Sequence, residues 1–283
     1  MLYICIPVHN EAPTIGVLLW RIRKVFQEYS REYEIVVYDD GSTDATAETL
    51  APYTRVMPLT ILGGGTHRGY AAAVDALVRA VASRTKYPRR DAMVLMQGDF
   101  TDQPEQLPEL VKRFEGGADI VVGERPELLP AAPQPVRRLR RLAPWVLRPF
   151  VGVSGVADLT GTFRLLRIQV LRDLLKVVGD APVVTRGGWA ANAELLLRVV
   201  PLARRVEAVP LVPRYDLRPR ESRVRLFPDV KELSRFGWAS RGQRVTTLST
   251  PTRPAAVRTP PADAGAAQPQ AVPSAPPATQ PGA

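Results

Sequence analysis

The chain has few of the residues that form disulfides, metal clusters and membrane spans. Among its 283 residues Cys5 is the only cysteine, so no internal disulfide can form and a reducing compartment is expected. Cys5 stands in an apolar strand pattern, which favours a core position over a nucleophile. Two histidines and no Cys/His pairs at ligand spacing argue against a zinc cluster. No apolar run reaches about 18 residues and no signal-peptide pattern is found, so we expect neither a transmembrane helix nor a cleaved leader.

Two common nucleotide-binding signatures are also missing. A glycine-rich turn at residues 63–69 precedes a helical pattern at 70–83, and such a turn can bind a phosphate. It contains neither G-x-G-x-x-G nor G-K-[ST], so the dinucleotide fingerprint and the P-loop do not apply. A plain flexible turn explains these glycines at least as well.

The composition is strongly basic. A net charge of +10 favours an anionic partner, which can be a phosphate group, a nucleic acid or an acidic membrane surface. Charge alone does not choose among these partners. Because no nucleic-acid reading motif is recognisable, no nucleic-acid partner is expected.

Short apolar runs alternate with amphipathic patterns, which is typical of an α/β fold. Strands are expected at residues 2–8, 35–38, 57–62, 92–96, 118–122 and 206–212. Helices are expected at residues 14–29, 44–50, 70–83, 107–114, 168–178, 189–200 and 226–238. Thr14 is the expected cap of the first helix. The first strand–helix–strand unit favours parallel pairing through a right-handed crossover.

Acidic side chains directly follow two of these strands. Asp39 and Asp40 end the second strand, and Asp99 follows the fourth. In an open α/β sheet, ligands bind beside the carboxyl ends of the strands, so these carboxylates are expected at the edge of a pocket. For an isolated Asp-Asp-Gly-Ser turn, a role limited to turn formation and helix capping explains the residues equally well.

Several longer motifs occur together. They are IPVHNE (6–11), VVYDDGSTD (36–44), HRGYAAAV (67–74), MQGDFTDQPE (96–105), DIVVGER (119–125) and DLTGTFRLL (158–166). Their order and spacing resemble family 2 glycosyltransferases across residues 2–225, and most of all the dolichol- and polyprenyl-phosphate mannosyl and glucosyl transferases. The resemblance implies a GT-A fold, an α/β nucleotide-sugar-binding domain whose mostly parallel central sheet is flanked by helices. It also implies a nucleotide-sugar donor and an inverting transfer.

The resemblance assigns donor binding to residues near several strand ends. The residues implied to contact the nucleotide or its phosphates are Pro7, Asn10, Glu11, Asp39, Asp40, Gly69 and Arg125. Residues 218–223 resemble the family's basic R-x-x-G-E-S-K segment, which closes over the diphosphate, and this implies contacts by Arg218, Arg220 and Ser222. Because Arg220 replaces the glycine of that pattern, the geometry of this loop is expected to differ.

The family's D-x-D metal motif is incomplete in this chain. Asp99 matches its second carboxylate, but Gln97, an amide, stands in place of the first. A Mg²⁺ or Mn²⁺ ion prefers hard oxygen ligands and takes one or two carboxylates together with substrate phosphates. We therefore expect Asp99 to hold the ion more weakly than in the family, with Gln97 offering only an uncharged oxygen. Asp102 is a possible substitute ligand, although a loop or cap role explains it better.

Two acids and one basic segment bear on the acceptor. The segment DLTGTFR, which begins at Asp158, resembles the family's D-x-T-S-G-F-R segment, and Glu194 lies in a helix like one that carries an inward glutamate. Both acids are candidate catalytic bases for a hydroxyl acceptor, whereas a phosphate acceptor needs no base. A structural role explains Glu194 equally well.

Residues 137–150 interleave arginines with Trp and Leu, which suits an anionic membrane surface, a clamp for a lipid phosphate, or a solvated basic helix.

We expect a GT-A-like domain at 1–225, an amphipathic appendage at 226–245 and a disordered Pro/Ala-rich tail at 246–283. The predicted function is hexose transfer, with a polyprenyl phosphate as the preferred acceptor. The protein is expected to be cytoplasmic and peripherally bound to the inner membrane face. The alternative is a degenerate, non-catalytic protein that binds a nucleotide or recruits a partner to the membrane, which Gln97 and Arg220 favour and the intact aspartates oppose.

Overall fold

The computed structural model describes residues 1–125, 132–211 and 225–246. The predictions for Arg218, Arg220 and Ser222 fall outside the described residues, as do those for the tail beyond residue 246.

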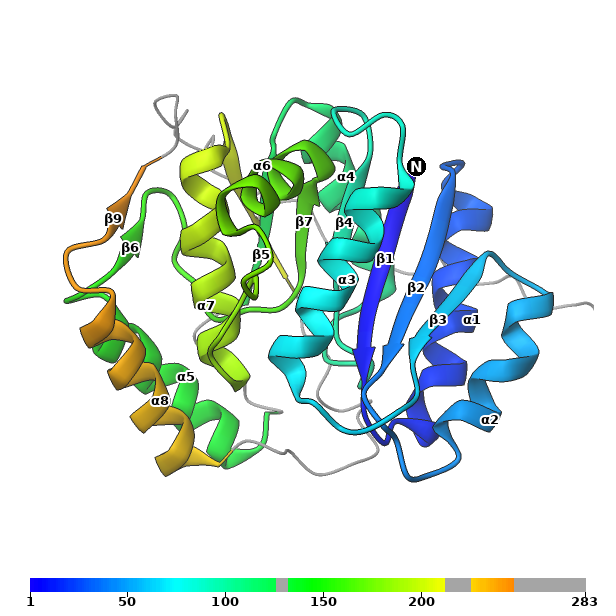
Figure 1. The fold of residues 1–283 in the computed structure, drawn as a ribbon, viewed down its shortest axis with the longest axis horizontal. Coiled ribbons are helices and arrows are strands. Elements are labelled where there is room, and N and C mark those ends of the chain that lie inside the picture. Colours follow the sequence, from blue (N-terminus) through cyan, green and yellow to red (C-terminus); the bar gives the residue numbers. More distant parts are fainter. Residues whose placement is uncertain (126–131, 212–224, 247–283) are drawn as a thin grey trace, which may run out of the picture. The chain divides into compact units, whose positions relative to one another are not determined.

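A seven-stranded, mostly parallel sheet runs through the molecule (Figure 1). Its strands lie in the order β3-β2-β1-β4-β7-β5-β8. Only β7 runs against its neighbours, because it pairs antiparallel with both β4 and β5. The α/β fold class is therefore confirmed. The strands are β1 (Leu2–Val8), β2 (Tyr33–Asp39), β3 (Leu59–Gly63), β4 (Ala92–Leu95), β5 (Ile120–Glu124), β7 (Arg164–Arg167) and β8 (Val206–Pro210).

Helices cover both faces of this sheet (Figure 1). One face packs against α1 (Ala12–Glu28) and α4 (Leu107–Glu115). The other packs against α3 (Tyr70–Arg84), α6 (Ile168–Val178) and α7 (Gly188–Val199). The short helix α2 (Thr46–Leu50) follows β2, and 3-10 turns span Ala51–Arg55, Pro104–Gln106 and Val200–Leu202.

The alternation of side chains along β1 shows why two cores form. Leu2 and Ile4 belong to the core beneath α1, whereas Tyr3 and Cys5 belong to the core beneath α3. Cys5 is fully buried, which confirms its predicted core position, and burial raises the pKa of its thiol.

The start of α1 differs from the prediction. The helix begins at Ala12, with Pro13 in its first turn, where a missing N–H removes no hydrogen bond. Thr14 therefore lies inside the helix and is not its cap. Its hydroxyl donates to the backbone carbonyl of Glu11 at 3.1 Å.

The antiparallel strand β7 was not predicted from the sequence. It has only four residues, and the arginines at both of its ends hide it from a search for alternating apolar residues. Arg164 is nevertheless buried, and its guanidinium donates to the backbone carbonyls of Leu159 and Asn192. Burial lowers the pKa of Arg164 to about 10. These carbonyl contacts compensate for the loss of hydration at this position.

Helices α5 (Gln134–Leu147) and α8 (Leu226–Ala239) pack against each other, and α8 also contacts α7. Leu233 and Phe236 of α8 are buried in the core beneath α3. A two-stranded sheet of β6 (Gly152–Val153) and β9 (Arg244–Val245) joins the same region. The residues predicted as an amphipathic appendage thus pack within the unit Met1–Thr252.

Membrane-spanning helices are not found in the described part of the chain, where each helix is too short or too polar to cross a bilayer.

Replacing Leu233 by alanine tests whether α8 is part of the folding unit. Leu233 is fully buried, so we expect Leu233→Ala to lower the free energy of unfolding by about 2–5 kcal/mol in urea titrations. Phe227→Ala on the same helix is the control, because Phe227 is 85% exposed. Equal stability of wild type and Leu233→Ala would show that α8 does not contribute to the core.

Candidate active site

The carboxylates at the end of β2 organise the loops around them. Asp40 accepts the backbone N–H groups of Arg68 at 2.7 Å and Gly69 at 2.8 Å. Asp39 accepts the backbone N–H of Ser42 at 2.9 Å. Both aspartates are buried. Asp40 therefore holds the segment that leads into α3 against the end of β2, which is a structural use of a residue predicted to contact the nucleotide.

Two glycines allow these loops to approach each other. Gly41 has a φ of +67°, and a Cβ at this position would lie 2.6 Å from the backbone carbonyl oxygen of Gly65. Gly69 has a φ of +91° and directly precedes α3. Only glycine adopts such angles without strain. The backbone itself therefore requires the glycine of the Asp-Asp-Gly-Ser turn, and Gly69 lies beside Asp40.

The loop after β1 is tied to the loop after β2. Asn10 donates its backbone N–H to Ser42 Oγ at 2.9 Å, and its side-chain oxygen accepts the backbone N–H of Thr43 at 2.7 Å. Glu11 is buried at the start of α1, and Pro7 lies in β1 next to β2. The structure thus brings Pro7, Asn10 and Glu11 to the edge of the sheet where Asp39 and Asp40 lie.

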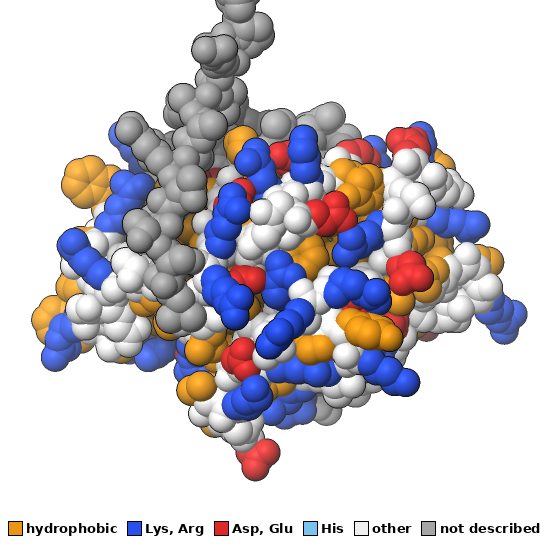
Figure 2. Space-filling view, turned by 90° about the horizontal axis from the view of Figure 1, so that it is seen from above, with side chains coloured by type: hydrophobic (Ala, Val, Ile, Leu, Met, Phe, Trp, Pro, Cys, Tyr) orange, Lys and Arg blue, Asp and Glu red, His pale blue; other side chains and the backbone are white. Residues whose placement is uncertain are grey.

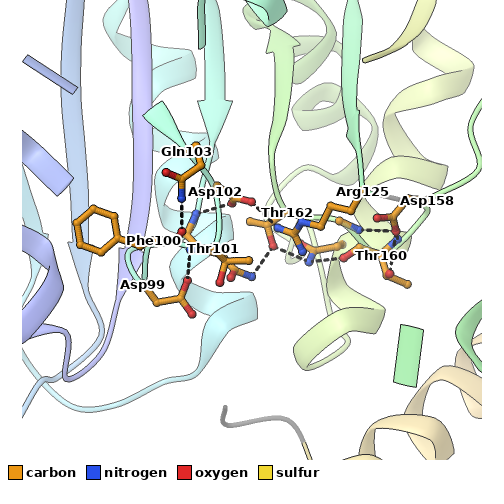
Figure 3. A network of polar contacts seen from close by, with 12 residues as sticks. Asp99, Phe100, Thr101, Asp102, Gln103, Arg125, Asp158, Thr160 and Thr162 are labelled. Carbon is orange, nitrogen blue, oxygen red and sulfur yellow. Dashed lines mark hydrogen bonds and ion pairs between the residues drawn. The ribbon is translucent and has the colours of Figure 1, made fainter. Parts of the chain in front are cut away.

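A buried ion pair anchors the loop after β4 (Figure 3). Asp102 pairs with Arg125, and its other oxygen accepts the backbone N–H of Gln97 at 2.9 Å. The two charged side chains are 0% and 4% exposed. Burial raises the pKa of Asp102, although the adjacent guanidinium opposes this shift. Asp102 therefore holds Arg125 and Gln97 in place, which argues against its prediction as a substitute metal ligand.

Asp99 and Gln97, the residues of the incomplete D-x-D motif, both lie in the loop after β4. Asp99 is buried and accepts the backbone N–H of Thr101 at 3.0 Å. The Thr101 hydroxyl is also buried and has no hydrogen-bond partner within the described ranges. Gln97 is half-buried and donates its Nε2 to Thr162 Oγ1 at 2.9 Å.

These donors fit a divalent ion only when another anion completes its shell. Across residues 1–125, 132–211 and 225–246, no group of three or more His, Cys, Asp or Glu side chains could hold a metal. One carboxylate with the neutral oxygens of Gln97 and Thr101 is a weak set of ligands. A Mg²⁺ or Mn²⁺ ion bound to a diphosphate, however, needs only one or two carboxylates from the protein. The residues therefore fit an ion that is shared with substrate phosphates.

Asp158 lies beside Thr160 (Figure 3), accepts a hydrogen bond from its hydroxyl, and is paired with an arginine of α5. One of its oxygens accepts the backbone N–H groups of Thr160 and Gly161, each at 3.0 Å, and the other lies 3.0 Å from Arg140. Burial pushes the pKa of Asp158 upward, but Arg140, Arg125 and the bonds from Thr160 outweigh it and hold the pKa below its ordinary value. A carboxylate with a lowered pKa accepts protons weakly, which argues against Asp158 as a general base.

Arg140 is the arginine of α5 that reaches this site. Its side chain is only 8% exposed, and Nη2 also donates to the backbone carbonyl of Arg125 at 3.2 Å. Its Nε and Nη1 are buried and have no hydrogen-bond partner among the residues that the structure describes. A guanidinium group with unused donors, held beside Arg125, can bind a phosphate group in a bidentate manner.

Residues 3–175 match the family model described as Glycosyl transferase family 2, which covers more than half of the chain. The protein belongs to glycosyltransferase family 2.

This glycosyltransferase is similar to an undecaprenyl-phosphate 4-deoxy-4-formamido-L-arabinose transferase of Pseudomonas fluorescens. The two are 30% identical over 118 residues, which make up 42% of this chain and 33% of that protein. The chain thus aligns with about a third of the length of the curated relatives it matches.

Solved structures show that the fold is shared. Glucosyl-3-phosphoglycerate synthase of M. tuberculosis gives a TM-score of 0.56 at 18% identity, over 85% of this chain and 78% of that chain. TarS residues 1–349 of S. aureus, in complex with UDP-GlcNAc, gives a TM-score of 0.51 at 14% identity, over 79% of this chain and 60% of that chain. The GT-A-like fold implied by the motifs is therefore confirmed.

Glu194 of the glycosyltransferase is hydrogen-bonded to the turn that precedes its own helix, α7. Its two oxygens accept the backbone N–H and hydroxyl of Thr185 and the backbone N–H of Arg186, and one oxygen pairs with Arg198 at 2.7 Å. These contacts hold the turn that leads into α7. They favour the structural role that the sequence left open over a role as a base.

Two histidines of the glycosyltransferase were not assigned from the sequence. The rings of His9 and His67 lie in contact, with centroids 4.2 Å apart and planes tilted by 34°, and both Nδ1 atoms lie about 3 Å from the backbone carbonyl oxygen of Asp40. His67 Nδ1 also lies 2.9 Å from the Asp40 carboxylate. Each histidine belongs to a quoted motif, IPVHNE or HRGYAAAV, and this was the available signal. Their contact joins two loops that are distant in sequence.

Replacing Asp158 by asparagine should produce a pH-dependent loss of stability. At neutral pH the variant leaves Arg140 buried without its counter-charge, and breaking a buried pair in this way costs about 3–5 kcal/mol of unfolding free energy. The folded pKa of Asp158 lies below its ordinary value of 3.8. Its contribution is therefore complete above that pH and is lost as the pH falls through the folded pKa. In urea titrations, the difference between wild type and variant should shrink below about pH 4.

Asp173→Asn is the matched control, because Asp173 pairs with Lys176 on the surface, where their side chains are 35% and 72% exposed. Its cost should stay within about 1 kcal/mol. A difference for Asp158→Asn that is constant between neutral pH and about pH 3 would contradict the assignment of the ionised pair.

Proposed function

We propose that this family 2 glycosyltransferase moves a hexose from a nucleotide diphosphate sugar to a polyprenyl phosphate, with inversion. The main supporting observation is the pair of buried guanidinium groups, Arg125 and Arg140, each held by its own carboxylate beside the loop of Asp99. Family membership supports glycosyl transfer. The similar formamido-arabinose transferase is named for undecaprenyl phosphate, which supports an acceptor of this class.

The donor binds, in this proposal, along the carboxyl ends of β1, β2 and β4. Ligands of open α/β sheets bind at this edge, and the cross-tied loops of Asn10, Asp39 and Asp40 form a rigid support there. Asp39 accepts from a base N–H, and Arg125 binds phosphate oxygens. A support that is already ordered loses little conformational entropy on binding.

The reaction is a single in-line displacement at the anomeric carbon through an oxocarbenium-like state. A phosphate acceptor is already ionised at pH 7, so it attacks without a general base. The lowered pKa of Asp158 agrees with this requirement, because Asp158 remains a carboxylate that positions Arg140. Arg140 in turn orients the acceptor phosphate, and guanidinium groups stabilise the charge that gathers on the departing nucleotide diphosphate.

A divalent ion would be held by the Asp99 carboxylate and the Gln97 carbonyl oxygen. When bound, Mg²⁺ or Mn²⁺ supplies a positive charge that stabilises the leaving diphosphate. Asp99 provides the only charge of the incomplete D-x-D motif, so the ion is expected to bind more weakly than it would between two carboxylates.

The proposed membrane-facing surface is formed by the outer sides of α5 and α8. Trp145 is 80% exposed, Phe227 is 85% exposed and Trp238 is 61% exposed. An apolar groove between the helices is lined by Trp145, Val146, Phe150, Ser234, Arg235 and Trp238. Exposed arginines flank these aromatic residues, at Arg137, Arg138 and Arg141 on α5 and at Arg148 directly after it. Aromatic and basic side chains in this combination suit the headgroup region of an anionic membrane.

Basic charge alone does not locate this surface. Figure 2 looks from above onto the end of the molecule where β1 begins, and Lys and Arg side chains are spread over it among acidic ones. The aromatic residues of α5 and α8 therefore carry the membrane proposal, which places a cytoplasmic protein peripherally on the inner membrane face.

The transfer reaction can be tested with Arg140→Lys. Wild type is incubated with UDP- or GDP-hexoses, Mn²⁺ and a short, water-soluble prenyl phosphate, and the glycolipid is measured by mass spectrometry. Lysine keeps the charge beside Asp158 but loses the bidentate fork. Losing one charge-assisted bond costs about 1.5–3 kcal/mol, so kcat/KM for the acceptor should fall by roughly 10- to 150-fold.

Arg138→Lys is the control, because Arg138 is exposed on the same helix, and its kcat/KM should match that of wild type. Nucleotide binding without any glycolipid, for every donor, would refute the transferase and favour the non-catalytic binder.

Membrane binding can be tested with a pair of tryptophan variants. Trp145→Ala should weaken flotation with vesicles that contain phosphatidylglycerol, and added salt should weaken the binding of wild type because exposed charges are screened. Trp20→Ala is the control, since Trp20 is 56% exposed on α1, away from the proposed surface. Equal binding to vesicles of phosphatidylcholine alone would contradict the anionic-membrane proposal.

A further inference from the structure

A chain of hydrogen bonds connects the side-chain amide of Gln97 to Thr162, Asn192 and Tyr70. Gln97 Nε2 donates to Thr162 Oγ1 at 2.9 Å, and Asn192 Nδ2 donates to the same hydroxyl at 3.2 Å. The Tyr70 hydroxyl donates to Asn192 Oδ1 at 2.7 Å. Burial raises the pKa of Tyr70 to about 12, so the phenol keeps its proton at neutral pH. The hydroxyl of Thr162 therefore lies in a fixed position, supported by residues of α3 and α7.

In this arrangement the nitrogen of the Gln97 amide faces Thr162. Thr162 is 1% exposed, so water does not compete for its hydroxyl. The Nε2 end of the planar amide is bonded to Thr162, and its carbonyl oxygen must point away from that residue. Asn192 Nδ2 also donates to the backbone carbonyl of Thr160 at 3.0 Å, so Asn192 faces Thr162 as a donor, and Thr162 Oγ1 accepts from both amides.

The contact between Gln97 and Thr162 depends on the chemistry of both side chains. The amide supplies the N–H, and the hydroxyl accepts it at 2.9 Å. A carboxylate at position 97 would have no N–H to donate, and a glycine at position 162 would have no side chain to accept one. The hydrogen bond therefore joins two segments that are distant in sequence only with this pair of residue types.

We propose that Thr162 is a positioning residue that presents the Gln97 carbonyl oxygen as a neutral ligand for a divalent ion. The site then has Asp99 as its only carboxylate, and it is completed by the phosphates of a bound nucleoside diphosphate. This inference rests on the proposed nucleotide-sugar donor. Thr162 acts through Gln97 and does not itself touch the ion. The buried, unpartnered hydroxyl of Thr101, next to Asp99 in the described structure, is a further neutral oxygen at this site.

The consequence is strong coupling between the ion and the nucleotide. A site with one carboxylate and neutral oxygens holds a divalent ion poorly, and the two phosphates of the nucleotide supply the missing anionic ligands. Linkage then requires that Mn²⁺ raise the affinity for the nucleoside diphosphate by the same factor by which the nucleotide raises the affinity for Mn²⁺.

The experiment measures Mn²⁺ binding by electron paramagnetic resonance, without turnover and without an acceptor. Mn²⁺ is titrated into the full chain alone and with saturating UDP or GDP, whichever raises the melting temperature. Wild type should bind Mn²⁺ at least tenfold more tightly with the nucleotide than without it. Loss of a residue that orients a metal ligand typically costs 10- to 100-fold in affinity, so Thr162→Val should weaken Mn²⁺ binding to the nucleotide complex by about that factor.

Three variants separate positioning from a merely structural role. Thr162→Ser keeps the hydroxyl and should retain wild-type Mn²⁺ affinity. Gln97→Leu removes the carbonyl and should match Thr162→Val. In the Gln97→Leu background, the further change Thr162→Val should have no effect on Mn²⁺ affinity, since coupled residues show non-additive effects. Nucleotide affinity without Mn²⁺ should be the same in wild type and in all four variants.

Additive losses in the double variant, or undiminished Mn²⁺ affinity in both Thr162→Val and Gln97→Leu, would overturn the inference while leaving the proposed function intact. Wild type that binds Mn²⁺ equally well with and without nucleotide would also overturn it. Failure of wild type to bind any nucleoside diphosphate, with or without Mn²⁺, would instead overturn the proposed function and this inference with it.

Discussion

The buried ion pair between Asp102 and Arg125 is the interaction on which the site depends. Charges removed from water are tolerated when they are paired and hydrogen-bonded. This pair joins the end of β4 to the end of β5 across the antiparallel β7 that lies between them. The backbone carbonyl of Arg125 accepts a hydrogen bond from Arg140, and Arg140 is paired with Asp158. Two ion pairs in series therefore connect the loop after β4, the end of β5, α5 and the loop before β7.

The acids of the site mainly hold arginines and backbone N–H groups in place. Asp102 and Asp158 each neutralise an arginine, and Asp40 accepts backbone N–H groups. Such supports keep guanidinium groups in a desolvated place, where their attraction for a phosphate is stronger than in water. A phosphate acceptor suits this arrangement, because it is already ionised at neutral pH and needs no side chain to act as a general base.

At Gln97 an amide stands where the family's D-x-D motif has a carboxylate. The backbone N–H of Gln97 is bonded to Asp102, a contact that does not use the side chain at this position. The amide retains an oxygen that can face an ion but carries no charge, and Thr162 supplies the acceptor that the amide requires. A motif search detects the lost carboxylate. It does not detect the partner of its replacement, because that partner lies on a separate segment.

The sequence by itself determined the α/β class, the motifs of the family and the strand ends that carry Asp39, Asp40 and Asp99, because hydrophobic periodicity and turn residues are local signals. Only the tertiary structure decided that β7 lies between β4 and β5, since a strand of four residues that begins and ends with arginine shows no apolar alternation. It also decided which arginine of α5 faces inward, and that Asp102 and Asp158 hold arginines. These contacts join residues that are distant in sequence, so they depend on strand order and on the rotation of helices about their axes, which no local pattern encodes.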